Sequence, residues 1–130
     1  MNAFAEFGLL PTLQETLLEK GILCPTEIQV RALPALLNVR SIVGIAETGS
    51  GKTLAHALPA MHHMKSLEIA GDAITLSARP RAVVVVPTRG LGEQVTKVFK
   101  PFTHTTRLRV RSVLGGTTTE VAKRGLAWAV

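Results

Sequence analysis

The sequence predicts an α/β domain with a mainly parallel sheet flanked by helices. Three short apolar segments have the composition of buried strands, and stretches with helical periodicity separate them. A glycine-rich turn joins the first of these segments to a helix, an arrangement that holds phosphates at a helix N-terminus. The chain has 130 residues, of which 46% are hydrophobic, so it can form one core but not two ordinary domains. We therefore expect one domain with strands at residues 41–46, 82–87 and 108–114.

The N-terminal part of the chain predicts two helices. Residues 12–20 place leucines at helical spacing, with Pro11 near the first turn and Gly21 in the position of a C-terminal cap. A second helix is expected to begin at Thr26, because its hydroxyl can accept hydrogen bonds from the free amides of the first turn. We expect Pro34 to kink or interrupt this helix.

Two further helices are expected to cover the sheet. Residues 53–64 are apolar with helical periodicity although they contain Pro59, and residues 91–99 place their apolar side chains on one face. The segment between them, residues 66–80, contains turn-forming pairs and is predicted to be a loop.

The composition excludes several classes of protein. The apolar content and a modest net charge of +6 argue against disorder. The single cysteine cannot form an internal disulfide, and no Cys/His group has zinc-ligand spacing, which favours a reducing setting. No apolar run approaches the roughly 18 residues that span a bilayer, and the N-terminal residues lack the features of a targeting segment. We therefore expect an intracellular, cytoplasmic protein with no membrane partner.

Charge is distributed unevenly along the chain. Residues 1–78 hold five basic and seven acidic residues, a net charge of −2, whereas residues 79–130 hold ten basic and two acidic residues, a net charge of +8. Such asymmetry indicates an anionic partner for the C-terminal half, with a solvated basic face as the alternative. Arg107, Arg109 and Arg111 alternate with apolar residues, so they point to one side of the predicted strand. We expect an edge or solvent-facing strand there.

A phosphate-binding loop follows the first predicted strand. It matches a Walker A loop (P-loop), with alanine in place of the first glycine of the general pattern. An apolar strand precedes it and a helical stretch follows it, which is the structural context that such a loop requires. The loop residues are Ala46, Glu47, Thr48, Gly49, Ser50, Gly51, Lys52 and Thr53.

The residue types of this loop suit a nucleoside triphosphate. Gly49 and Gly51 permit backbone conformations that turn consecutive amides toward phosphates. Lys52 is expected to neutralise the β and γ oxygens, which makes it the catalytic candidate, and Thr53 is expected to offer its hydroxyl to Mg²⁺. The alternative is a glycine-rich turn that binds nothing. We predict nucleotide binding.

Three further segments extend the pattern. Phe4, followed by residues 21–29, resembles the Q motif of DEAD-box ATP-dependent RNA helicases; residues 87–94 resemble motif Ia of that family, and residues 115–117 resemble its GG element. The phosphate loop, residues 46–53, is similar to the family's motif I, which also starts with alanine. The resemblance covers nearly the whole chain. It implies the N-terminal portion of the first RecA-like helicase domain, with the second helicase domain absent.

The Q motif resemblance concerns the base of ATP. Gln29 carries an amide that both donates and accepts hydrogen bonds, so it can pair with the edge of adenine, and the family uses its glutamine in this way. Phe4 is expected to stack on the base. Packing of Phe4 in the core is the alternative.

The other two motifs imply contact with RNA. Pro87 ends a predicted strand, so Thr88 and Arg89 are expected at the carboxyl edge of the sheet, where parallel sheets bind ligands. Arg89 can pair with a backbone phosphate. The resemblance adds Gly115 and Gly116 as RNA contacts, with a plain turn as the alternative for this pair.

The sequence also departs from the family pattern. Gly90 and Gly92 stand where motif Ia has glutamate and alanine, and two glycines are expected to loosen the start of a helix. The Asp-Glu-Ala-Asp motif, which supplies the carboxylates for hydrolysis, is absent from the 130 residues. We therefore expect no ATPase or unwinding activity from this chain alone.

Three hypotheses about function follow. The first is an ATP-binding and RNA-binding portion of a DEAD-box RNA helicase, which works with the missing helicase domains if the chain is a fragment. The second is a non-catalytic RNA-binding or regulatory module with a vestigial P-loop. The third is another P-loop enzyme, such as a kinase or a GTPase, against which Gln29 and the missing guanine-recognition motif argue.

Overall fold

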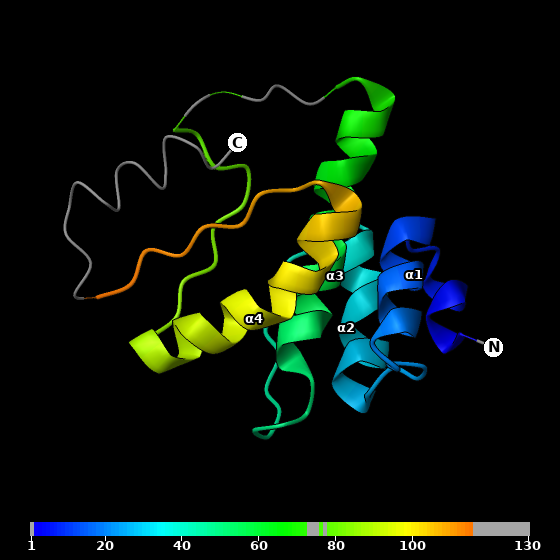
Figure 1. Ribbon diagram of the computed structural model, residues 1–130. Coiled ribbons are helices and arrows are strands. Elements are labelled where there is room, and N and C mark those ends of the chain that lie inside the picture. The colour runs from blue at the N-terminus through cyan, green and yellow to red at the C-terminus, as the bar shows by residue number, and fades with distance from the viewer. Residues whose placement is uncertain (1, 73–75, 77, 116–130) are drawn as a thin grey trace.

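The computed structural model describes residues 2–72, 76 and 78–115. Helices dominate these residues (Figure 1): a 3₁₀ helix is followed by four α-helices. Their bounds are η1 Ala3–Phe7, α1 Pro11–Glu19, α2 Glu27–Leu37, α3 Lys52–Ala70 and α4 Arg89–Thr106. None of the described helices is long and apolar enough to cross a membrane.

Local sequence signals set most of the helix ends. Pro11 is the first residue of α1, Thr26 precedes α2 as its N-cap, and Gly71 ends α3 with a φ of 78°. The predicted loop at residues 66–80 is wrong in its first part, because no Gly or Pro interrupts the chain between Met64 and Gly71 and α3 therefore continues to Ala70. Likewise α2 continues through Pro34 without interruption.

The core lies between the helices. α2 packs mainly against α3, while α4 packs against both α1 and α3. A hydrogen bond of 2.7 Å between the hydroxyls of Thr16 and Thr105 joins α1 to α4, so the buried Thr16 hydroxyl has a partner. The core side chains are Phe4, Leu9, Leu13, Leu17, Leu33, Ala57, Leu58, Met61, Phe99, Phe102 and Leu108.

The three predicted strands run without regular secondary structure, so the structure does not confirm the sheet. Among the described residues no strand is assigned. Apolar side chains of the first two segments are largely exposed: 93% for Val43, 92% for Ile45 and 87% for Val85. A strand is stable only when neighbours pair its edges and cover its faces. These segments are rich in valine and isoleucine, as buried strands are, but no neighbouring segment among the described residues covers these exposed side chains.

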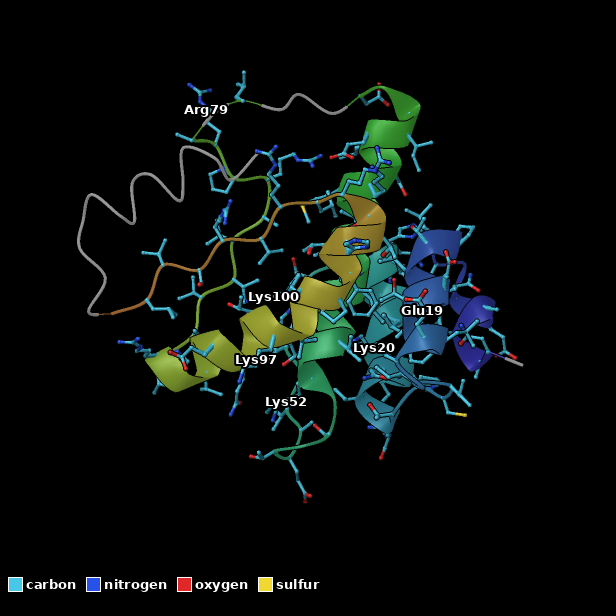
Figure 2. All side chains as sticks on the ribbon, viewed as in Figure 1. Glu19, Lys20, Lys52, Arg79, Lys97 and Lys100 are labelled. Atoms are coloured by element: carbon cyan, nitrogen blue, oxygen red, sulfur yellow. The ribbon has the colours of Figure 1, made fainter. Side chains whose placement is uncertain are left out.

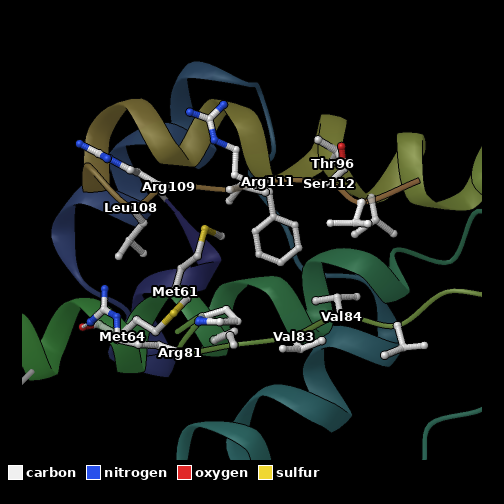
Figure 3. Close-up of a pocket in the computed structure, with 18 of the residues that line it drawn as sticks. Met61, Met64, Arg81, Val83, Val84, Thr96, Leu108, Arg109, Arg111 and Ser112 are labelled. Atoms are coloured by element: carbon white, nitrogen blue, oxygen red, sulfur yellow. Dashed lines mark hydrogen bonds between the residues drawn. The ribbon is translucent and has the colours of Figure 1, made fainter. Parts of the chain in front are cut away.

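A cavity of about 430 Å³ separates two of these segments from α3 and α4. Figure 3 shows Met61 of α3 between the segment that carries Val83 and Val84 and the segment that begins at Leu108. In the segment that begins at Leu108, the expected alternation of exposed and buried side chains is present, because Arg109 and Arg111 are exposed while Leu108 is buried.

The first turn of α4 contains both glycines of the motif Ia segment. A Cβ at Gly90 would have no heavy atom within 4 Å, whereas a Cβ at Gly92 would lie 2.7 Å from Leu114 Cδ2. We expect Gly90→Ala to raise the free energy of unfolding by about 0.5–1 kcal/mol through helix propensity. Gly92→Ala is expected to raise the free energy of unfolding by less, because the Leu114 side chain must move to make room for the added methyl group. Thermal unfolding of the two variants checks this, and a larger gain for Gly92→Ala would contradict it.

His62 on α3 holds the N-terminal segment by a hydrogen bond that depends on protonation. Its Nδ1 accepts a bond of 3.3 Å from the Leu10 backbone N–H, which requires a neutral ring. Burial, and secondarily the charge of His63, lower the pKa of His62. The stability from neutral His62 is thus present above its unfolded pKa of about 6.5 and is lost as pH falls through the folded pKa.

Urea unfolding between neutral and mildly acidic pH checks this expectation. We predict a fall in unfolding free energy that is reduced in His62→Asn, which keeps an acceptor near the Nδ1 position and does not titrate. His104→Asn changes an exposed histidine of α4 and is the matched control. An identical pH dependence in all three proteins would contradict the role given to His62.

Candidate nucleotide and RNA site

The phosphate loop adopts the turn that its glycines predict. Gly49 and Gly51 have φ values of 81° and 84°, in the left-handed region that other residues avoid. The Ser50 hydroxyl and backbone N–H both donate to Glu47 O, at 2.6 and 3.2 Å, and close the turn. α3 begins immediately at Lys52, so the free amides of its first turn face the loop. The turn and the helix start have the arrangement that the predicted phosphate site requires.

Lys52 turns back over the loop. Its Nζ donates to the backbone oxygens of Ala46 and Glu47, the second at 3.1 Å. Both bonds are exposed, so a phosphate can replace these carbonyls as the partner of the ammonium group. The side chain therefore needs only a local rotation to meet a bound phosphate.

Gln29 is almost completely buried, with 2% of its surface exposed, and both ends of its amide are engaged. Its Oε1 accepts from the Thr26 backbone N–H at 3.0 Å, and its Nε2 donates to Gly51 O at 3.0 Å. A Cβ at Gly51 would lie 2.5 Å from this Nε2, so only glycine fits there. The side chain expected to contact adenine thus joins the start of α2 to the phosphate loop.

An open pocket of about 480 Å³ lies between α2 and the loop. Glu27 and Arg31 form an ion pair of 2.6 Å at its edge, with both side chains more than three-quarters exposed. This pair was not predicted from the sequence, although an acid and a base four residues apart in a helix are a recognisable signal. The lining residues are Thr26, Glu27, Ile28, Arg31, Ile45, Ala46, Glu47 and Ser50.

Phe4 lies in the core and is fully buried. Its ring centroid is 6.4 Å from that of Phe7, which is half-buried. In this structure Phe4 therefore presents no exposed face to a base, and its position is that of the packing alternative. Stacking of Phe4 on a base therefore stays a prediction. The two phenylalanines of η1 are equally apolar, so the sequence alone does not decide which one points inward.

Arg89, one of the expected RNA contacts, lies beside Gly115, which is another. Thr88 caps α4 by accepting from the Leu91 backbone N–H at 3.2 Å. Arg89 Nη1 donates to Gly115 O at 3.3 Å, across 26 positions of sequence. Arg89 Nε also pairs with Glu93 at 3.1 Å, a partner that the sequence analysis missed. Gly116, the last expected RNA contact, lies outside the described residues.

The donor set for a metal ion is small. Thr53 is the second residue of α3, where its hydroxyl belongs to the first turn beside the loop. Within the ranges that the structure describes, no three His, Cys, Asp or Glu side chains come together as metal ligands. Mg²⁺ accepts one protein oxygen together with phosphate and water ligands, so a single threonine hydroxyl fits this ion when a nucleotide supplies the rest.

Comparison with known proteins identifies related sequences. A family model described as DEAD/DEAH box helicase matches residues 26–127. DEAD-box ATP-dependent RNA helicase 39 of Arabidopsis thaliana is 43% identical over 113 residues, which cover 87% of this chain and 18% of that protein. ATP-dependent RNA helicase dbp10 of Schizosaccharomyces pombe is 38% identical over 117 residues, 90% of this chain and 13% of that protein. The chain thus spans less than a fifth of these relatives.

Two solved structures are similar to the model. The RNA helicase Prp28 from Chaetomium thermophilum, bound to ADP, matches with a TM-score of 0.80 and 32% identity over 99% of this chain and 31% of that one. Dbp5 from S. cerevisiae, bound to RNA and ADP BeF3, matches with a TM-score of 0.74 and 26% identity over 92% of this chain and 29% of that one. These similarities show a RecA-like fold.

Proposed function

Because this chain belongs to the DEAD/DEAH box helicase family, we propose that it is the ATP-binding and RNA-binding portion of an ATP-dependent RNA helicase. The observation that carries this proposal is the bond from Gln29 Nε2 to Gly51 O, which joins the Q motif segment to the phosphate loop. The proposed portions are the Q motif at residues 4–29, motif I at 46–53, motif Ia at 87–94 and the GG element at 115–117.

ATP is the proposed nucleotide. The amides of the loop and of the first turn of α3 surround the phosphates, and Lys52 leaves its carbonyl partners to neutralise them. Thr53 gives one oxygen to Mg²⁺. Gln29 holds the loop in place through its bonds to the Thr26 N–H and to Gly51 O. Its contact with adenine stays a prediction and requires one of these two bonds to open. The ADP-bound and ADP BeF3-bound neighbours support nucleotide binding at this fold.

RNA is the proposed macromolecular partner. The proposed contact with the RNA backbone is formed by Thr88, Arg89, Gly115 and Gly116, and the RNA-bound neighbour supports this partner.

Two expectations from the sequence also stay proposals. The proposed strands of a mainly parallel sheet are the segments 41–46, 82–87 and 108–114. A cytoplasmic location stays a prediction.

We further propose that these residues bind ATP without hydrolysing it on their own. Hydrolysis requires a carboxylate to hold the Mg²⁺ shell and a residue to orient the attacking water. The chain has a single aspartate, Asp72, which lies two residues beyond the end of α3 and far along the helix from the loop. We propose that rate acceleration depends on the segments of the family that carry the Asp-Glu-Ala-Asp motif, which is absent from these 130 residues.

Titration with fluorescent ATP and GTP analogues tests the nucleotide proposal. We expect ATP to bind in preference to GTP, and Lys52→Ala to weaken ATP binding about 10- to 100-fold, the value of one charge-assisted hydrogen-bond partner. Lys65→Ala is the control, because Lys65 lies on the same helix and pairs with Glu68 away from the loop. Equal and negligible affinity in wild type and Lys52→Ala would favour a vestigial loop.

A further inference from the structure

Exposed basic residues lie on the outer face of α4 and at its C-terminal end, and we call them the α4 basic stripe: Lys97, Lys100 and Arg107. Positions three residues apart share one side of a helix, which places Lys97 and Lys100 together. Arg107 is the C-cap, with a φ of 58°, and follows the last residue of α4. Figure 2 shows Lys97 and Lys100 projecting from the surface of α4. On the opposite side of the helix Phe99 and Phe102 enter the core, which fixes this orientation.

The charges of the stripe are not neutralised by the protein. In the part of the chain that the structure describes, none of the three stripe residues forms an ion pair. Arg89 lies eight residues before Lys97 on the same helix, but Glu93 pairs with it. Glu93 is also the only acid on α4. The unpaired positive charge of this helix therefore lies beyond Arg89, along the part that no motif covers.

We propose that the α4 basic stripe binds the phosphate backbone of RNA and extends the contact that begins at Thr88 and Arg89. This inference rests on the proposed RNA binding. The 18 residues of α4 span about 27 Å, and the phosphates of a stacked strand recur about every 3.4 Å of its axis, so the helix passes several phosphates. Lysines act on phosphate as point charges, and the contact is therefore independent of RNA sequence.

An acidic protein surface is the competing partner, and the apolar content of the helix argues against it. Stable protein interfaces have buried apolar or aromatic anchors at their centre. Leu91 is the only large apolar side chain that α4 exposes, and it lies at the opposite end from the stripe. A surface with cations and no apolar anchor suits a polyanion whose binding is driven by counterion release.

The test measures RNA affinity at several salt concentrations. The probe is fluorescent single-stranded oligouridine long enough to span α4, and the variants are Lys97→Gln and Lys100→Gln. Each is expected to weaken binding about fivefold at about 0.1 M salt and to make the plot of log Kd against log salt shallower by about 0.7. Arg40→Gln, which removes an exposed and unpaired cation after α2, is the control and is expected to leave the slope unchanged.

Each outcome decides between the two proposals. Normal wild-type binding with an unchanged slope in both lysine variants rejects the stripe and leaves RNA binding intact. No wild-type binding to oligouridine rejects RNA binding itself, and the stripe with it. If the variants lose affinity for poly-L-glutamate while their RNA slope is unchanged, the stripe belongs to an acidic protein partner and our proposal is wrong. Circular dichroism verifies that α4 is intact in each variant.

Discussion

Phe4→Ala is expected to lower the free energy of unfolding by about 3–5 kcal/mol, the usual cost of removing a buried phenylalanine ring. Phe4 is fully buried in the core cluster, so alanine leaves a cavity that the surrounding leucines fill only in part. Phe7→Ala is the matched control in the same 3₁₀ helix. Its ring is only half-buried, and we expect a distinctly smaller loss. Urea unfolding of the two variants measures the difference.

ATP affinity separates the packing role of Phe4 from base stacking. Phe4→Leu keeps most of the apolar volume and is expected to cost less than about 1.5 kcal/mol, so the variant remains folded for titration. If the ring only packs in the core, ATP binds Phe4→Leu and wild type equally well. A normally stable Phe4→Leu protein with tenfold weaker ATP binding would restore the stacking interpretation.

Features that depend on local sequence could be predicted, and those that depend on distant partners could not. The helix starts at Pro11 and Thr26 follow from the residues themselves, because caps act within one turn. The anion-binding turn at residues 49–51 follows from its glycines for the same reason. The strands differ: residues 82–87 have a strand composition, but pairing and covering require segments far along the chain.

The site shows the same division. The resemblance to a helicase motif predicts that Gln29 contacts the base, whereas its bond to Gly51 depends on how close α2 lies to the loop, which the sequence does not give. The bond from the Thr26 backbone N–H to Gln29 could nevertheless be predicted, since threonine followed three positions later by glutamine is the pattern of a capping box. The bond from Arg89 to Gly115 could not be predicted, because no local sequence pattern relates residues that are 26 positions apart.

Gln29→Glu is expected to reduce both stability and phosphate binding. Glutamate keeps the acceptor for the Thr26 amide but replaces the Nε2 donor with an oxygen that faces Gly51 O. A buried carboxylate opposite a carbonyl oxygen costs on the order of 2–4 kcal/mol at neutral pH. Burial raises the folded-state pKa of this carboxyl above the unfolded value of about 4.3, and protonation restores an O–H donor. We therefore expect the deficit to shrink as pH falls from neutral toward about 4.3 and to be absent below it.

Inorganic triphosphate distinguishes holding the loop from contacting the base. If Gln29 positions Gly51, the variant binds both ATP and inorganic triphosphate more weakly, because the loop amides no longer converge on the phosphates. If Gln29 only contacts adenine, ATP binding falls, triphosphate binding is unchanged, and the unfolding free energy stays at the wild-type value. Gln94→Glu, an exposed change on α4, controls for the added charge. A stable Gln29→Glu protein with a loss confined to ATP would therefore contradict the role in the loop.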